Sequence, residues 1–188
     1  MKLRVKKRFY LIMLLVICAV LFVKSDLLAP IIYPVHFKNE IRISAKNYNV
    51  EPHLVAAIIR SESNFKTGRE SRKGALGLMQ IMPSTAEWIV QKAGFDNVSV
   101  DMLRDRADIS IEVGTWYLSS LVEQFENNKI AAVAAYNAGP GNVRKWLNSG
   151  VWDGRLETVK QIPFGETRHY VQRVHYYYNK YKELYPNM

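Results

Sequence analysis

The sequence has little with which to cross-link a fold or bind a metal. Its 188 residues include one cysteine, Cys18, so a disulfide framework within one chain is impossible. The four histidines lack the spacing of metal ligands; they are His36, His53, His169 and His175. We therefore expect no metal and no cofactor.

Strand patterns, internal repeats and low-complexity tracts are also scarce. Hydrophobic residues make up 48% of the chain and charged residues 23%, which is enough apolar material for a packed core. Apolar residues recur at helical steps in seven segments: 37–50, 51–63, 82–94, 105–127, 128–141, 141–150 and 167–185. Pro52 marks a helix start, Gly94 a helix stop and Asn142 an N-cap. The sequence predicts an all-α domain, with at most one small hairpin in the loop 64–74.

The chain also lacks a basic stripe, although its net charge is +9. Five of these nine charges lie in the first eight residues, "MKLRVKKR", so only four remain for the rest. Lys and Arg do not gather with interleaved aromatics, as a nucleic-acid face requires. We therefore expect no nucleic-acid partner. A mildly basic surface suits an anionic polymer, including cell-wall polymer.

The N-terminus reads as a membrane-targeting segment. An uncharged apolar run, residues 9–23, follows the basic cluster, and no clear small-x-small cleavage site comes after it. The positive-inside rule predicts a cytoplasmic segment at 1–8 and a single-pass transmembrane signal anchor at 9–28. An extended linker at 29–37, stiffened by Pro30 and Pro34, would lead to an extracytoplasmic domain at 38–188. Secretion after signal cleavage is the alternative.

One acidic residue stands where an apolar helix ends. Residues 55–59 are apolar, so the Glu62 that follows should be largely buried. A buried carboxylate is costly unless it is paired or protonated, and a raised pKa is what a general acid for glycosidic cleavage needs. The structural alternative is a glutamate that pairs with a nearby arginine or caps a loop.

Four separated motifs give Glu62 a context. They are "ESNF", "GALGLMQIMPSTA", "AAYNAGPGNVRKWL" and "IPFGETRHYVQRV". In this order they resemble the catalytic domain of soluble lytic transglycosylases, a family with a lysozyme-like fold related to goose-type lysozyme. The resemblance covers roughly residues 38–184 and implies a helical domain with an active-site cleft.

The resemblance implies a role for ten residues. Glu62 matches the single catalytic acid/base, and Ser63 would orient it. Met79 and Gln80 would line the sugar site, and Tyr136 would hydrogen-bond the catalytic carboxyl. The full set of expected substrate-binding residues is Ser63, Gly77, Leu78, Met79, Gln80, Tyr136, Asn137, Glu166 and Tyr170.

Several of these residues have a plainer interpretation. Met79 alone would more often be core packing, and Gln80 a solvated loop residue. Tyr136 could bury its ring and satisfy its hydroxyl locally. Glu166 could be only a favourable charge at a helix N-terminus.

The implied activity is cleavage of peptidoglycan glycan strands with formation of 1,6-anhydromuramic ends, by a monomer that serves cell-wall remodelling or turnover. One acid suits an intramolecular reaction, because hydrolases normally use two flanking carboxylates. No spacing makes Glu70, Asp153 or Glu166 a nucleophile. Two alternatives stay open: a goose-lysozyme-like hydrolase that uses water, and a catalytically silent glycan-binding module.

Overall fold

The computed structural model describes residues 2–23 and 29–188 and divides into two compact units, Met1–Val35 and His36–Met188. The first unit holds α1 (Lys2–Val23) and α2 (Ala29–Ile32). The predicted extended linker is therefore wrong over 29–32. Pro30 falls in the first turn of α2, where a missing N–H leaves no intrahelical hydrogen bond unmade.

The predicted transmembrane helix over 9–28 is not supported. No helix within residues 2–23 and 29–188 is long and apolar enough to cross a membrane. In α1, basic residues occupy the first turns and leave an apolar run of only 15 residues, whereas a span needs about 20. Residues 24–28 of the predicted span lie outside the described residues.

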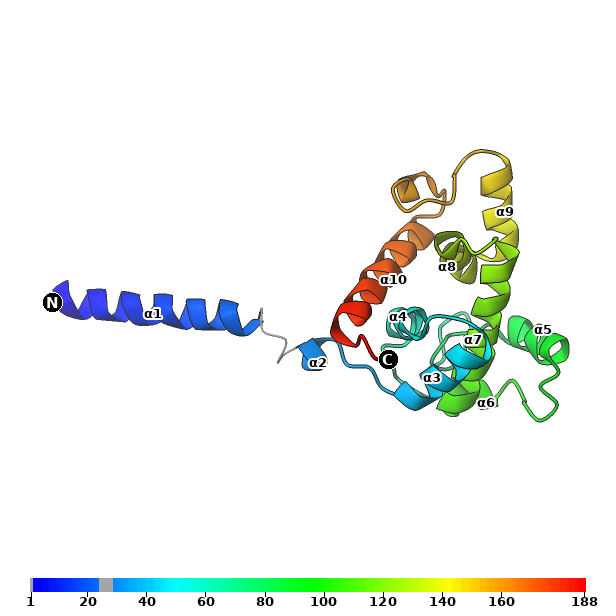
Figure 1. Ribbon diagram of the computed structural model, residues 1–188, viewed down its shortest axis with the longest axis horizontal. Helices are drawn as coiled ribbons and strands as arrows, with labels where there is room; N and C mark the ends of the chain where they lie inside the picture. Colours follow the sequence, from blue (N-terminus) through cyan, green and yellow to red (C-terminus); the bar gives the residue numbers. More distant parts are fainter. Residues whose placement is uncertain (1, 24–28) are drawn as a thin grey trace. The chain divides into compact units, whose positions relative to one another are not determined.

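The second unit confirms the all-α prediction (Figure 1). Every predicted helix is present, and each end lies within a few residues of its predicted place. The helices are α3 (Lys38–Asn47), α4 (Pro52–Glu62), α5 (Pro83–Ala93), α6 (Met102–Asp105), α7 (Ala107–Gln124), α8 (Lys129–Ala138), α9 (Pro140–Asn148) and α10 (Gly165–Leu184), with a 3₁₀ helix, η1 (Val159–Gln161).

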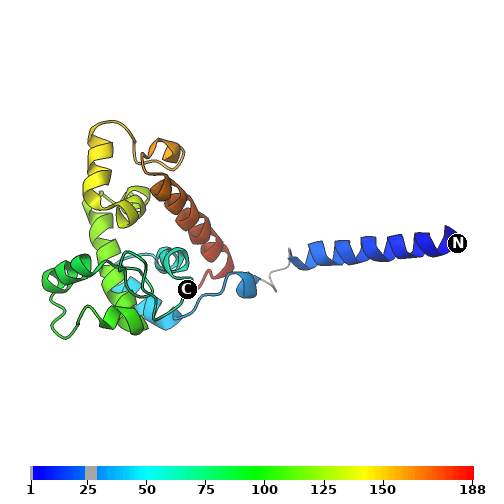
Figure 2. The same ribbon diagram turned by 180° about the vertical axis from the view of Figure 1, so that it is seen from behind.

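Helix α4 forms the centre of this unit. It packs against α3 and α10, while α7 packs against α3, α5, α6 and α8 (Figures 1 and 2). Residues 55–59 in the middle of α4 are completely buried, and this stretch is apolar on every side because neighbouring helices or loops cover it. Polar residues flank this stretch at the two ends of α4, where Glu51 precedes the helix and Glu62 is its last residue.

Three local predictions differ from the structure. The short elements α6 and η1 were missed, since four-residue and three-residue helices leave no periodic signal. The loop after α4 forms isolated bridges, Glu70 with Leu76 and Leu76 with Ile81, and no strand occurs in the part of the chain that the structure describes. Asn142 is not an N-cap: α9 begins at Pro140, and the Asn142 amide donates to the Ala138 carbonyl at 2.7 Å.

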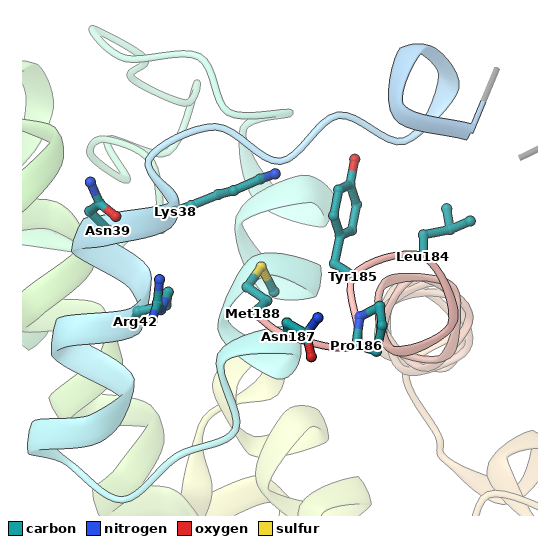
Figure 3. A pocket seen from close by; sticks show the side chains of 8 residues that line it. All are labelled: Lys38, Asn39, Arg42, Leu184, Tyr185, Pro186, Asn187 and Met188. Atoms are coloured by element: carbon teal, nitrogen blue, oxygen red, sulfur yellow. The ribbon is translucent and has the colours of Figure 1, made fainter. Parts of the chain in front are cut away.

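The C-terminal segment docks beside α3. Figure 3 shows the hollow of about 350 Å³ that it forms with Lys38, Asn39 and Arg42. The Lys38 ammonium lies 4.5 Å from the centroid of the Tyr185 ring, and the Tyr185 carbonyl lies 2.8 Å from His53 Nε2. These contacts tie the end of α10 to α3 and α4.

Candidate active site

A tight turn sets the position of Glu62. Glu62 is the last residue of α4, and the backbone N–H groups of Ser63 and Asn64 both donate to the Ile59 carbonyl, at 3.0 and 3.1 Å. Asn64 and Phe65 then adopt left-handed backbone angles, with φ of 56° and 59°. Such angles are costly for residues with a side chain and persist only where packing enforces them. Here the Phe65 ring is buried, so packing holds the turn that ends α4 at the acid.

A cavity of about 580 Å³ opens at this helix end. It brings together five of the predicted site residues: Glu62, Gln80, Tyr136, Asn137 and Glu166. They come from the end of α4, the loop before α5, the end of α8 and the start of α10. A cavity is therefore present where the cleft is predicted, and the end of the central helix α4 lines it through Glu62.

Burial makes Glu62 a weaker acid than an ordinary glutamate. Desolvation raises the pKa of its carboxyl from 4.5 to about 7, and the negative charge of Glu166 adds to this rise. The Tyr170 hydroxyl and the positive charges of Arg173 and Arg69 act in the opposite direction without cancelling it. Near neutral pH Glu62 is therefore present in both protonated and ionised forms, which suits a group that acts first as an acid and then as a base.

The tyrosine beside the acid is Tyr170. Its hydroxyl is buried, and no hydrogen-bond partner lies at standard distance within the described chain. It is still close enough to the Glu62 carboxyl to lower the pKa of Glu62, and burial together with the charge of Glu62 raises the pKa of Tyr170. Long contacts of this kind in substrate-free active sites often tighten when substrate binds.

Tyr136 makes a different contact from the one expected. Its hydroxyl donates to the Met79 carbonyl at 2.9 Å and not to the Glu62 carboxyl. Tyr136 nevertheless lines the cavity, and burial together with the negative charge of Glu62 raises its pKa. It therefore joins α8 to the loop before α5, and its effect on Glu62 is through space.

Five predicted substrate-binding residues are not among those that line the cavity: Ser63, Gly77, Leu78, Met79 and Tyr170. Ser63 is buried, and its hydroxyl donates to the Ile59 carbonyl at 3.2 Å. The side chains of Leu78 and Met79 are almost completely buried. A Cβ on Gly114 of α7 would lie 2.5 Å from Met79 Sδ, so Gly114 makes the room that Met79 fills. The core-packing interpretation of Met79 is the one that the structure favours.

Gly77 has a backbone reason for being glycine. Its φ is 73°, and a Cβ there would lie 1.8 Å from the Leu103 carbonyl oxygen. Gly77 thus brings the loop into direct contact with α6. Gln80, three residues later, also has a positive φ of 50°, and its amide donates to the Gly77 carbonyl at 2.8 Å while it faces the cavity.

The comparison with known families agrees with this geometry. The Transglycosylase SLT domain family matches residues 39–156, more than half of the chain. The chain belongs to the transglycosylase SLT family. The predicted family is thereby confirmed; the matched residues lie in the second unit, which is called the SLT domain from here on.

The relatives are longer proteins. The Soluble lytic murein transglycosylase of Salmonella typhimurium is 37% identical over 76% of this chain and 22% of its own length. The Membrane-bound lytic murein transglycosylase C of Actinobacillus pleuropneumoniae is 28% identical over 77% of this chain and 45% of its own. The chain thus spans between about a fifth and a half of these relatives.

A solved structure shows the same fold. The lytic transglycosylase Slt of Pseudomonas aeruginosa, solved as an inactive mutant with glutamine in place of a glutamate, is 38% identical with a TM-score of 0.75. The alignment covers 82% of this chain and 25% of that one. The lysozyme-like helical fold of the SLT domain is therefore confirmed.

Five cavity residues of the SLT domain were not predicted: Ser71, Arg72, Lys73, Ala75 and Met82. Within this set, Ser71 begins a turn in which its hydroxyl accepts from the backbone N–H of Ala75 at 2.9 Å, and Gly74 donates to the Ser71 carbonyl at 2.9 Å. The signal was in the sequence, because "SRKG" has serine at the first and glycine at the fourth position of a turn. The turn holds two cations, Arg72 and Lys73, at the cavity rim.

The start of α10 is tied to the end of α8. Thr167 Oγ1 donates to Asn137 Oδ1 at 2.7 Å, next to Glu166 in the first turn of α10.

In residues 2–23 and 29–188, no three His, Cys, Asp or Glu side chains are grouped so that they could hold a metal ion.

Proposed function

We propose that the SLT domain is a peptidoglycan lytic transglycosylase. It would cleave the β-1,4 bond between N-acetylmuramic acid and N-acetylglucosamine and would serve cell-wall remodelling or turnover in bacteria. The observation that carries the proposal is one buried acid, Glu62, with a pKa of about 7, which lines a cavity large enough for sugar rings. The names of the relatives, which are lytic murein transglycosylases, support the same substrate.

The proposed reaction uses Glu62 twice. Protonated Glu62 donates its proton to the glycosidic oxygen as the bond from that oxygen to C1 of muramic acid breaks. The substrate's own N-acetyl group stabilises the positive charge that develops at C1. The Glu62 carboxylate then takes the proton of the C6 hydroxyl as O6 bonds to C1, which returns Glu62 to its starting state and yields the 1,6-anhydro sugar.

A second carboxylate in the cavity favours one alternative, a hydrolase that uses water. Glu166 lines the same cavity as Glu62 and could position a water molecule. Neither of the other two acids lines this cavity. Glu70 Oε2 lies 3.9 Å from Arg104 Nη1, and Asp153 Oδ1 accepts a hydrogen bond from the backbone N–H of Arg155. Hydrolysis is therefore the second candidate, with Glu166 as its base.

The products decide between the two reactions. The C6 hydroxyl arrives on the same ring as C1, and well-oriented intramolecular groups reach effective concentrations of about 10⁵ M or more. Mass spectrometry of muropeptides released by the full-length chain should therefore find mainly 1,6-anhydro ends, even in dilute substrate. A majority of reducing ends would establish hydrolysis instead, and Glu166→Gln should then abolish it.

We also propose that the N-terminal segment attaches the chain to a membrane, with the SLT domain on the extracytoplasmic side. The support is the basic cluster followed by the apolar run of α1, and the relative that is named membrane-bound. Fractionation should find the full-length chain in the membrane fraction after an alkaline wash. A soluble mature chain beginning near residues 25–35 would show a cleaved signal peptide instead.

A further inference from the structure

The outer side of helix α3 carries three cations in a row. Helix α3 packs against α4 and α7, and its buried residues are Ile41, Ser44 and Ala45. The opposite side is exposed. We call it the α3 face, and it consists of Lys38, Asn39, Arg42, Ile43, Lys46 and Asn47. Residues 38, 42 and 46 are four apart, so their side chains follow one another along the same side of the helix.

The three cations are not neutralised by the protein. None of them forms an ion pair with another residue in the part of the chain that the structure describes. The one acidic residue in the sequence of α3 is Glu40, so the helix carries three cations against one carboxylate. The α3 face therefore keeps a positive charge that an anionic partner can meet.

An exposed isoleucine lies beside this row of cations. Ile43 is 61% exposed, and in the sequence it follows Arg42 and precedes Lys46 by three residues. A single exposed aliphatic side chain is common on protein surfaces and needs no explanation. An aliphatic side chain among cations, however, matches the surface of a membrane, where basic groups meet anionic headgroups and apolar groups enter between them.

The row also borders the hollow of about 350 Å³ in Figure 3. Lys38, Asn39 and Arg42 line one side of it, and residues 184–188 line the other. An ammonium, an amide and a guanidinium group on one wall can donate the hydrogen bonds that phosphate oxygens accept. The hollow is therefore suited to the phosphate of a lipid headgroup.

The α3 face lies close along the chain to the proposed membrane-attached segment. Fourteen residues, 24–37, separate the end of α1 from the start of α3. Even a fully extended chain of this length spans only about 50 Å. Such a tether keeps the membrane surface at a high effective concentration, so contacts too weak for a free protein suffice. Helix α3, which is described throughout, contributes no residue to the active-site cavity, so a membrane on this face would leave the cavity open.

We propose that the α3 face docks the SLT domain on a surface of anionic phospholipid. Lipid phosphates bind Lys38, Arg42 and Lys46, while Ile43 enters between the headgroups. The inference rests on the proposed membrane attachment and is independent of the proposed reaction. It gives the chain a second contact with the membrane, and an apolar segment combined with a basic patch binds more firmly than either alone.

A fluorescent label on the full-length chain measures this docking. Cys18→Ala removes the native thiol, and Asn47→Cys places one label at the edge of the α3 face. Phosphatidylglycerol vesicles with a quencher at headgroup level should quench the label. Arg42→Gln together with Lys46→Gln should lower the ratio of docked to undocked domain by about 25-fold, about fivefold for each cation. Ile43→Ser should lower the same ratio severalfold without a change of charge.

Three controls locate the effect. A label at Val151 should stay unquenched, because this residue is 45% exposed and follows α9, which lies at the far end of the SLT domain from α3 (Figures 1 and 2). Lys92→Gln together with Lys145→Gln removes the same charge from α5 and α9 and should leave quenching at residue 47 unchanged. Vesicles of neutral phosphatidylcholine should quench neither label.

Three results would overturn the proposal. Equal quenching at residues 47 and 151, in a chain that floats with the vesicles, would refute docking through α3 alone. A chain that does not float with the vesicles would refute the proposed membrane attachment as well, whereas the released muropeptides test the reaction separately. If the substitutions of Arg42 and Lys46 weaken binding to isolated peptidoglycan but leave the quenching unchanged, the α3 face binds wall polymer and not lipid.

Discussion

Glu51 immediately precedes helix α4, and Glu62 is its last residue. The structure shifts the pKa values of these two carboxyls in opposite directions. Glu51, the residue before the helix, accepts hydrogen bonds from the Lys129 ammonium and from the Tyr178 hydroxyl, the latter at 2.5 Å. Burial alone would raise the pKa of Glu51, but these bonds and the charges of Lys129 and Lys182 outweigh it and lower the pKa. Glu62, at the other end, has its pKa raised to about 7.

Burial and direct contact with cations together make this difference, since Glu62 is the more deeply buried of the two and only Glu51 touches ammonium groups. Helix α10 offers both acids a tyrosine, Tyr178 to Glu51 and Tyr170 to Glu62. Only Glu51 also has an ammonium group against its oxygens, whereas Arg69 and Arg173 act on Glu62 through space. Helix polarity adds to this, because a negative charge is favoured at the N-terminus of α4 and disfavoured at its C-terminus.

The largest expected effect separates the two acids by activity. Glu62→Gln keeps the shape of the side chain but removes the proton, so turnover of peptidoglycan should fall by about two to four orders of magnitude. Glu51→Gln, on the same helix, should keep turnover within a few-fold of the unsubstituted protein once folding is verified. Near-normal wall lysis by a folded Glu62→Gln variant would refute the assignment of Glu62.

Glu62 and Glu51 should contribute to the pH dependence of the free energy of unfolding with opposite signs. Folded Glu62 retains a proton that the unfolded chain releases near pH 4.5, so its contribution is complete below about pH 4.5 and is lost as pH rises through about 7. Between those limits the stability contribution falls by about 3 kcal/mol. Glu62→Gln should therefore stabilise the fold at about pH 8 by up to that amount, and much less at about pH 5.

For Glu51 the sign reverses, because its folded pKa is lowered. Its contribution is present above the unfolded pKa and is lost as pH falls through the folded one. Glu51→Gln should thus cost about 1 kcal/mol at neutral pH, a modest value because the side chain is partly exposed. Urea unfolding of both variants across this pH range checks the pair; two shifts of the same sign would contradict the comparison.

The two tyrosines allow a finer test. The Tyr170 hydroxyl lowers the pKa of Glu62, so Tyr170→Phe should raise that pKa and move the alkaline limb of the pH–rate profile to higher pH. Tyr178→Phe should leave the profile where it is and lower stability by about 1 kcal/mol, one hydrogen bond to a charged group. A profile that moves equally in both variants, or in neither, would show that Tyr170 does not tune Glu62.

The smallest expected effect is a rise in the pKa of Glu51 towards that of Glu62. Lys129→Met removes the nearer of the two ammonium groups beside Glu51 and leaves Lys182, so the pKa of Glu51 should rise in part and stability at neutral pH should fall by about 1 kcal/mol or less. NMR titration of the Glu51 carboxyl measures the shift directly. Lys180→Met, which removes the ion pair with Glu183, is the control and should leave Glu51 unchanged.

The helices and the acid could be predicted from the sequence, whereas several side-chain roles could not. Periodicity and the proline and glycine signals gave every helix longer than four residues in the SLT domain, because both act over neighbouring residues. The position of Glu62 followed from the apolar run before it. Asn142 misled because Pro140, two residues earlier, could start the same helix.

The sequence alone does not predict which side chains of the "GLMQ" motif face the cavity. The motif identified the right loop, but only Gln80 of its four residues faces the cavity. Gly77 and Met79 are fixed by α6 and α7, segments at least two dozen residues away along the chain. Nothing local to the motif distinguishes a methionine that fills the space beside Gly114 from one that would touch a sugar.

The sequence by itself determined the all-α class, the order of the helices, the family and the single acid at the end of a buried helix. Each of these depends on patterns within a short stretch of chain, or on motifs in a fixed order. Tertiary structure alone decided which tyrosine lies beside Glu62 and which motif residues reach the cavity. It also decided that Glu51 is a stronger acid and Glu62 a weaker one, because acidity depends on how deeply packing buries the carboxylate and on whether cations from distant helices touch it.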